Sequence, residues 1–175
     1  MTYDKQILAL DLARVTGWAL GFAHDKVPQC GSFTITEQGA SMAKLFREWR
    51  LILKDFLSMN PEIGLVIFES PLPPIFRIGT TTMETMRRLI GLAAVTEEML
   101  YGSGLDVREA KVSDVRTHFI GSNRHKRHEA KMLTARQCRH LGWHPVDDNA
   151  ADALALHSYQ CSILRKQTLL KKVRQ

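Results

Sequence analysis

Short apolar runs separated by turn residues predict a set of β-strands in this chain. The first two runs, at 7–13 and 17–23, have only three residues between them, so a hairpin is the economical interpretation. A third strand is expected at 30–35. The run at 64–70 is almost wholly apolar, which is typical of a strand covered on both faces, and the prolines after it end the strand. A fifth strand is expected at 105–110.

Apolar residues at helical spacing predict the helices between and after these strands. The expected helices run from Ser41 to Asn60, from Thr81 or Thr82 to about Leu100, from Ser113 to Gly121, from Glu129 to Leu141, and from Asp147 or Asp148 past Ile163. The second helix is expected to turn inward Met83, Met86, Leu89, Ile90 and Ala93. This order of elements predicts an α/β architecture in which a five-stranded mixed sheet is flanked by helices.

Composition favours one domain over residues 1–175, because 45% of the residues are hydrophobic and can form an ordinary core. Cys30, Cys138 and Cys161 are far apart in sequence, so neither a disulfide framework nor a zinc site is expected. No apolar stretch approaches the roughly 18 residues that span a bilayer. We therefore expect a cytoplasmic protein that does not bind membranes.

Positive charge is concentrated in the C-terminal part of the chain. Residues 1–110 hold 11 Lys and Arg against 13 Asp and Glu, a net charge of −2, whereas residues 111–175 hold 13 against 5, a net charge of +8. Such asymmetry suits a polyanion such as nucleic acid. The densest run contains Arg124, His125, Lys126, Arg127, His128 and Lys131. We expect this run to contact phosphate, and residues 165–175 to be either a second contact or a disordered basic tail.

Three acids occupy positions where an acid is normally unfavourable. Asp11 interrupts the apolar first strand, Glu69 ends the apolar fourth strand, and Asp152 lies in the alanine-rich final helix. Buried carboxylates need a partner, and two Mg²⁺ ions roughly 3.5–4 Å apart would provide one. Such ions activate a water and stabilise the leaving 3′ oxygen in phosphodiester hydrolysis. Asp148 lies one helical turn before Asp152 and could face the same site.

Each acid also has an ordinary structural explanation. An Asp in a strand often accepts a hydrogen bond from a loop amide, and a Glu at a strand end is often simply solvated. Asp148 is a good helix N-cap whatever else it does. The ordered combination of an acid in strand one, an acid ending strand four and an acid in the last helix is the stronger signal.

That combination resembles the RNase H-like nucleases, and the local sequences are similar to the RuvC-type Holliday-junction resolvases, particularly the small ones of phages. The similar segments span nearly the whole chain: ILALDLARVTGWAL, VIFES, VSDVRTHFIG, the Glu129-Ala130-Lys131 helix start, and DDNAADALAL. The resemblance implies a Mg²⁺-dependent endonuclease, with Mn²⁺ as a substitute and no small-molecule cofactor. It also implies a homodimer that makes paired, symmetric incisions in four-way junctions or other branched DNA, in a bacterial or phage-infected cell.

The resemblance further implies roles for individual residues. Lys131 would stabilise negative charge near the scissile phosphate, and Arg116 would contact DNA. Where many family members carry a second acid three residues before Asp152, this chain has Asn149, so the fourth metal ligand is either Asp148, which we prefer, or Asn149. In the first strand, Ala13 stands two residues after Asp11, where the family's D-x-G pattern has glycine.

The family inserts an aromatic residue from the loop after the fourth-strand Glu into the junction. Phe76 is the candidate here, with Arg77 beside it for phosphate, although Phe76 could equally pack in the core. Three other functions remain open: a flap or fork nuclease, a junction-binding protein without catalysis, and a relative of the actin-like kinases and ATPases. The last usually needs two such domains and glycine-rich phosphate loops, which this sequence lacks.

Overall fold

The computed structural model describes residues 4–71 and 82–173, and within them five strands form one mixed sheet. The strands are β1 (Gln6–Asp11), β2 (Val15–Gly21), β3 (Gln29–Thr34), β4 (Ile63–Glu69) and β5 (Asp106–Ala110). Their order across the sheet is β3-β2-β1-β4-β5. The first three strands pair antiparallel, whereas β4 is parallel to both β1 and β5. The predicted α/β fold with a five-stranded mixed sheet is therefore confirmed.

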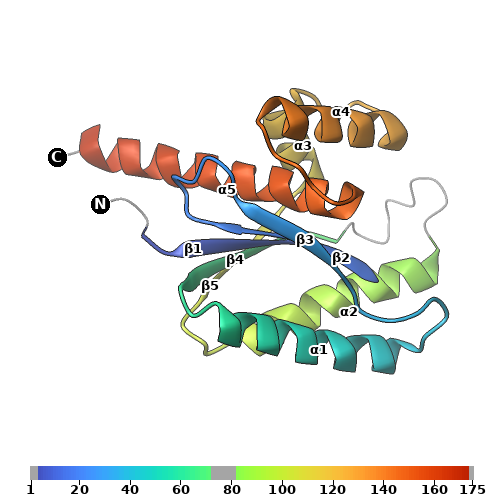
Figure 1. The fold of residues 1–175 in the computed structure, drawn as a ribbon. Helices are drawn as coiled ribbons and strands as arrows, with labels where there is room; N and C mark the ends of the chain where they lie inside the picture. The colour runs from blue at the N-terminus through green and yellow to red at the C-terminus, as the bar shows by residue number, and fades with distance from the viewer. Residues whose placement is uncertain (1–3, 72–81, 174–175) are drawn as a thin grey trace.

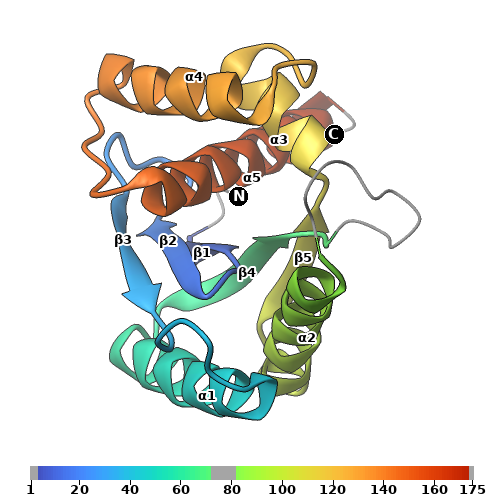
Figure 2. The same cartoon turned by 90° about the vertical axis from the view of Figure 1, so that its right-hand side faces the viewer.

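Helices cover both faces of this sheet and give a layered molecule (Figures 1 and 2). The helices are α1 (Met42–Met59), α2 (Met83–Leu100), α3 (Val112–Ile120), α4 (Arg127–His140) and α5 (Asp148–Val173). One face is covered by α1 and α2, and the other by α5, with α3 and α4 packed beside α5. The central strands β1 and β4 are consequently buried on both sides, as their continuous apolar sequences predicted.

Alternation of side chains along β1 and β4 decides which residues reach each layer. Ile7 and Ala9 of β1 point toward α5, whereas Leu8 and Leu10 point toward α1 and α2. In β4, Leu65 and Ile67 likewise belong to the core beneath α5. Asp11 is the next residue on the α5-facing side of β1, and Glu69 is the next on the α5-facing side of β4. Both acidic side chains therefore project from the same face of the sheet.

The structure differs from the prediction in the buried side of α2 and in the first residues of α3 and α4. In α2, Met83 and Ile90 are 52% and 42% exposed, so they do not face inward; the buried row instead contains Met86, Leu92, Ala93, Thr96 and Leu100. Lys111 rather than Ser113 precedes α3, and α4 begins at Arg127, two residues before the predicted Glu129.

The C-terminal segment is helical well beyond the expected end of regular structure. Helix α5 continues to Val173, so residues 165–173 are the last turns of a helix and not a disordered tail. No helix in the described ranges is long and apolar enough to cross a membrane.

Candidate active site

The carboxylates of Asp11 and Glu69 leave the sheet at the ends of two neighbouring parallel strands. Leu10 of β1 pairs with Phe68 of β4, and Asp11 and Glu69 are the next residues along each strand. Because the carboxyl ends of parallel strands lie at the same edge of a sheet, the two acids are neighbours. Both are partly buried.

Asp152 is brought to these two acids by the close approach of α5 to the sheet. The first turn of α5 lies directly over Gly17 of β2, which pairs with Asp11. A Cβ atom at Gly17 would lie 2.0 Å from the carbonyl oxygen of Asn149, so only glycine allows the helix to approach this closely. The alanines around Asp152 are buried as well, which is consistent with tight packing of the helix on the strands.

The pKa values show that the three acids interact. Burial, followed by the negative charge of Asp152, raises the pKa of Asp11 to about 7. Burial, followed by the charges of Asp11 and Asp152, raises the pKa of Glu69 to about 8. Burial also raises the pKa of Asp152. A cluster of this kind favours bound protons or a bound cation, because three negative charges repel one another in a poorly solvated place.

Three basic side chains oppose this repulsion from α3 and α4. Lys131 and Arg127 of α4 lower the pKa values of both Asp11 and Asp152. Arg116 of α3 lowers those of Glu69 and Asp152. A small cavity of about 40 Å³ lies where these elements meet, lined by Glu69, Val112, Val115, Arg116, Phe119, Thr134, Asp152 and Ala155. Positive charge from α3 and α4 therefore lies near the acids, where an anionic substrate would also be attracted.

Asp148 does not cap α5, which answers one question left open by the sequence. The cap is Asp147, whose Oδ1 atom accepts a hydrogen bond from the Ala150 amide at 2.8 Å. Asp148 lies in the first turn with its carboxylate exposed, and its Oδ2 atom accepts a hydrogen bond from Nζ of Lys131 at 3.2 Å. Asn149 directs its backbone carbonyl at Gly17.

Whether Asp11, Glu69 and Asp152 could hold a metal ion depends on their geometry and on the chemistry of their donor atoms. Among the described residues, no three or more His, Cys, Asp or Glu side chains are grouped so that they could hold a metal ion as they stand. The donor atoms themselves fit Mg²⁺ or Mn²⁺, since hard divalent cations prefer carboxylate oxygens. Asp11, Glu69 and Asp152 also affect one another's pKa values, so a cation between them would relieve their repulsion. The chemistry of these donor atoms therefore fits a hard divalent cation.

Four of the predicted nucleic-acid contacts, Arg116, Arg124, Lys126 and Arg127, lie in or just before α3 and α4, which pack beside α5 on the same side of the sheet as the acids. Arg124 and Lys126 precede α4, Arg127 is its first residue, and all three side chains are exposed. Phe76 and Arg77 lie outside the described residues.

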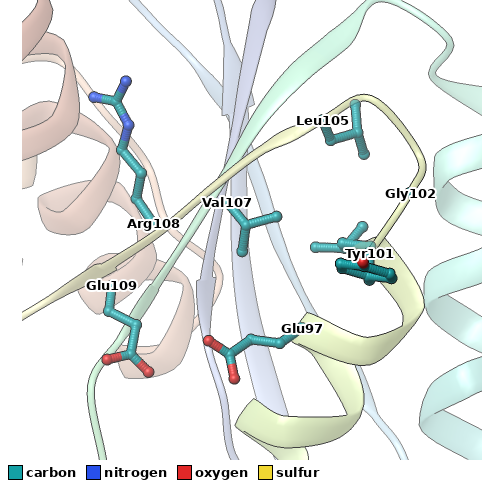
Figure 3. Close-up of a pocket in the computed structure, with 8 residues that line it drawn as sticks. Glu97, Tyr101, Gly102, Leu105, Val107, Arg108 and Glu109 are labelled. Atoms are coloured by element: carbon teal, nitrogen blue, oxygen red, sulfur yellow. The ribbon is translucent and has the colours of Figure 1, made fainter.

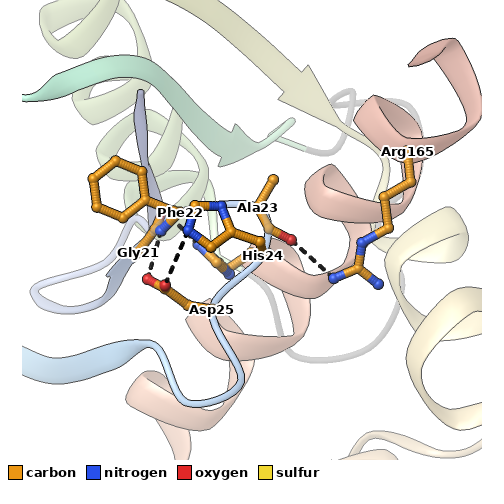
Figure 4. Close-up of polar contacts among 7 residues, drawn as sticks. Gly21, Phe22, Ala23, His24, Asp25 and Arg165 are labelled. Carbon is orange, nitrogen blue, oxygen red and sulfur yellow. Dashed lines mark hydrogen bonds and ion pairs between the residues drawn. The ribbon is translucent and has the colours of Figure 1, made fainter. Parts of the chain in front are cut away.

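Two further surface features lie outside this acid cluster. A larger cavity of about 270 Å³ lies beside β5 and the end of α2, where Glu97, Tyr101 and Glu109 are among its lining residues (Figure 3). It contains none of the predicted site residues. In the basic C-terminal segment that begins at residue 165, Arg165 of α5 donates a hydrogen bond to the carbonyl oxygen of Ala23 at 2.9 Å (Figure 4). That arginine therefore helps to hold the loop after β2 against α5.

Comparison with known proteins identifies the fold. No family model matches this sequence, and no curated protein matches it. Among solved structures, Thermus thermophilus RuvC in complex with a Holliday-junction substrate has a TM-score of 0.70, with 14% identity over 94% of this chain and 97% of that one. The chain has the RuvC fold. A second T. thermophilus RuvC structure has a TM-score of 0.63 at 14% identity, over 93% of this chain and 97% of that one.

The RuvC fold also extends to a eukaryotic neighbour. The yeast mitochondrial Holliday-junction resolvase Ydc2 has a TM-score of 0.68 at 10% identity, over 100% of this chain and 86% of that one. The predicted RNase H-like, RuvC-type fold is thus confirmed over nearly the whole chain.

Sequence reasoning missed one residue next to this site. The hydroxyl of Ser32 in β3 donates a hydrogen bond to Oδ1 of Asp147 at 2.7 Å. The sequence identifies Asp147 only as a possible helix cap, and nothing around Ser32 distinguishes it from any other serine in a strand.

Proposed function

We propose that this chain is a divalent-metal-dependent endonuclease that cuts branched DNA, with the four-way junction as its preferred substrate. The observation that carries the proposal is the convergence of Asp11, Glu69 and Asp152 from β1, β4 and α5 within the RuvC fold. Raised pKa values from burial and mutual repulsion are typical of functional carboxylates. One of the RuvC neighbours was solved with a Holliday-junction substrate, which supports the choice of DNA.

In this proposal Asp11, Glu69 and Asp152 hold Mg²⁺ or Mn²⁺, two ions per site, with Asp148 as the fourth ligand and Asn149 as its substitute. Cations held there would lower the pKa of the attacking water and neutralise charge on the leaving 3′ oxygen. Side chains of the protein bind the DNA, orient it and neutralise its charge.

Basic side chains bind and orient the DNA. Lys131 is within reach of Asp148 and is suited to neutralise charge at the scissile phosphate. Arg116 borders Glu69 and Asp152 and is suited to contact a neighbouring phosphate. Arg124, Lys126 and Arg127 contact the backbone farther along the duplex, and Phe76 and Arg77 are proposed to reach the branch point.

Paired cutting requires two such sites. A four-way junction is symmetric, and two incisions related by a two-fold axis need two active sites in the same relation, so we propose a homodimer of single-domain chains covering residues 1–175. The experiment that tests the whole proposal is cleavage of an immobile four-way junction, compared with flap, fork, duplex and single-stranded DNA. A protein that binds junctions without cutting them would lack the proposed catalytic role.

A further inference from the structure

One transverse row of the sheet lies beneath the first turn of α5. Asp11 of β1 pairs with Gly17 of β2, and Gly17 pairs with Ser32 of β3. These three neighbouring residues therefore lie side by side on three strands. The start of α5 crosses this row, because Asn149 contacts Gly17 and Asp147 contacts Ser32.

The side chain of Asp147 connects the edge strand to the helix. Its Oδ1 atom accepts a hydrogen bond from the Ser32 hydroxyl at 2.7 Å and another from the Ala150 amide at 2.8 Å. The second bond is an ordinary N-cap and is sufficient to start the helix. The bond to Ser32 is additional, and it joins residues 115 positions apart in the sequence.

The two contacts on the row constrain different movements of the helix. At Gly17 the absence of a side chain lets the helix come close to the strand. This contact has no directional bond, so it does not by itself fix the rotation of the first turn or its position along the strand. A directional hydrogen bond from the Ser32 hydroxyl to the cap residue opposes both movements, since such bonds weaken steeply as their geometry changes. Asp148 and Asp152 follow on the same rigid helix, so their placement depends on how this turn is set.

We propose that Ser32 and Asp147 are positioning residues for the acid cluster, and that they set the first turn of α5 so that Asp148 and Asp152 face Asp11 for binding a divalent cation. This inference rests on the proposed function for the identity of the cation-binding acids. It adds a requirement that the acids alone do not imply, namely a polar link from the outermost strand of the sheet to the start of α5.

The test compares Ser32→Ala, Ser32→Thr and Ser58→Ala by titration calorimetry with Mn²⁺ and by thermal unfolding. Ser32→Ala is expected to weaken Mn²⁺ binding by about threefold to tenfold, because it removes one hydrogen bond to a charged group. Ser32→Thr keeps the hydroxyl and is expected to recover most of that affinity. Ser58→Ala removes a serine hydrogen bond on α1, to the carbonyl of Asp55, and should leave Mn²⁺ binding unchanged.

A second pair of variants tests the other end of the link. Asp147→Asn keeps an acceptor for both the Ser32 hydroxyl and the Ala150 amide, whereas Asp147→Ala removes both hydrogen bonds. Asp147→Ala should therefore bind Mn²⁺ more weakly than Asp147→Asn. Wild-type Mn²⁺ affinity in Ser32→Ala, or equal losses in Ser32→Ala and Ser32→Thr, would overturn the inference.

The design separates this inference from the proposed function. A wild-type protein that binds Mn²⁺ but leaves every DNA substrate uncut would overturn the nuclease, and the Mn²⁺ affinities of the variants would still decide the role of Ser32. A wild-type protein that binds no Mn²⁺ would overturn both.

Discussion

Nζ of Lys131 lies 3.2 Å from Oδ2 of Asp148, and this contact joins α4 to the first turn of α5. The side chains are 32% and 58% exposed, so water screens the pair and its contribution to stability is at most about 1 kcal/mol. The position of the pair matters more than its strength. It holds an ammonium group beside the acids, where a phosphate would approach.

Replacing Lys131 should therefore affect catalysis more than folding. We expect Lys131→Ala to slow junction cleavage by about 100-fold, as removal of one group that neutralises transition-state charge usually does. Its free energy of unfolding should change by less than about 1 kcal/mol. Single-turnover cleavage and urea unfolding measure the two effects. A stable Lys131→Ala protein that cuts at the wild-type rate would exclude a catalytic role for the lysine.

The raised pKa values of Asp11 and Glu69 predict how stability depends on pH in the absence of metal. The folded-state values of about 7 and 8 exceed the ordinary values of 3.8 and 4.5. Between these limits the folded chain binds more protons than the unfolded chain, so this contribution to stability is present at low pH and disappears as pH rises from about 4 to about 8. Divalent cations bind the deprotonated acids, so stabilisation by Mg²⁺ should increase with pH.

Glu69→Gln provides the control for this pH dependence. His157 has a lowered pKa because it is buried, and it affects stability in the opposite direction as the pH falls. Comparing wild type with Glu69→Gln cancels that contribution, since His157 is common to both. In chelator, the melting temperature of Glu69→Gln relative to wild type should rise between pH 5 and pH 8. A constant difference would mean that Glu69 titrates normally in the folded protein.

Arg116 should influence the pH at which the site becomes active. Its positive charge lowers the pKa values of Glu69 and Asp152. Arg116→Gln removes that charge, so both pKa values should rise and the ascending limb of the pH–rate profile should move to higher pH. Arg116→Lys keeps the charge and should leave the limb near its wild-type position. If the two variants bind DNA more weakly but share the wild-type profile, Arg116 contacts only DNA.

The exposed basic residues at the start of α4 should contribute to DNA affinity by neutralising phosphates. We expect a triple alanine variant of Arg124, Lys126 and Arg127 to reduce the slope of log Kd against log salt concentration by roughly 2 to 3, since each phosphate that is no longer neutralised reduces the slope by about 0.9. The measurement is junction binding at several salt concentrations in a Glu69→Gln background.

A matched triple variant removes the same charge from the opposite side of the sheet. Arg47, Arg50 and Lys54 are exposed on α1, which covers the other face. Their replacement by alanine should leave the salt slope unchanged. Equal effects of the two triple variants would show that net charge, and not a defined surface, determines binding.

The sequence predicted those parts of the molecule that depend on local patterns. Asp11 and Glu69 stood out because each interrupts or ends an apolar strand, and the resemblance to the RNase H-like nucleases implied that both belong to one site. The α/β class followed from the order of strands and helices, and the RuvC-type fold followed from the resemblance. What could not be predicted depends on contacts between distant residues, such as the bond from Ser32 to Asp147 or the exposure of Met83 and Ile90 on α2. Both Met83 and Ile90 are hydrophobic, and the packing of α2 against α1 and the sheet decides which side of the helix is buried.

Helix ends were the other source of error. Arg127 and His128 begin α4 although neither has a favourable capping sequence before it, and Lys126 makes no side-chain cap. Basic composition suggested disorder after residue 165, yet α5 continues to Val173. The buried Leu164 and the bond from Arg165 to Ala23 anchor the start of this extension, and neither contact is visible in the local sequence.

The most direct test of the central claim is cleavage of an immobile four-way junction by wild type and Glu69→Gln in Mg²⁺, with flap, fork, duplex and single-stranded DNA in parallel. We predict paired nicks at symmetric positions in the junction, made by wild type and reduced by at least about 100-fold in Glu69→Gln, together with comparable junction binding by both proteins. Junction binding by wild type without any cleavage, or nicks that persist in Glu69→Gln, would contradict the proposed active site, and stronger cutting of flaps or forks would contradict the proposed substrate.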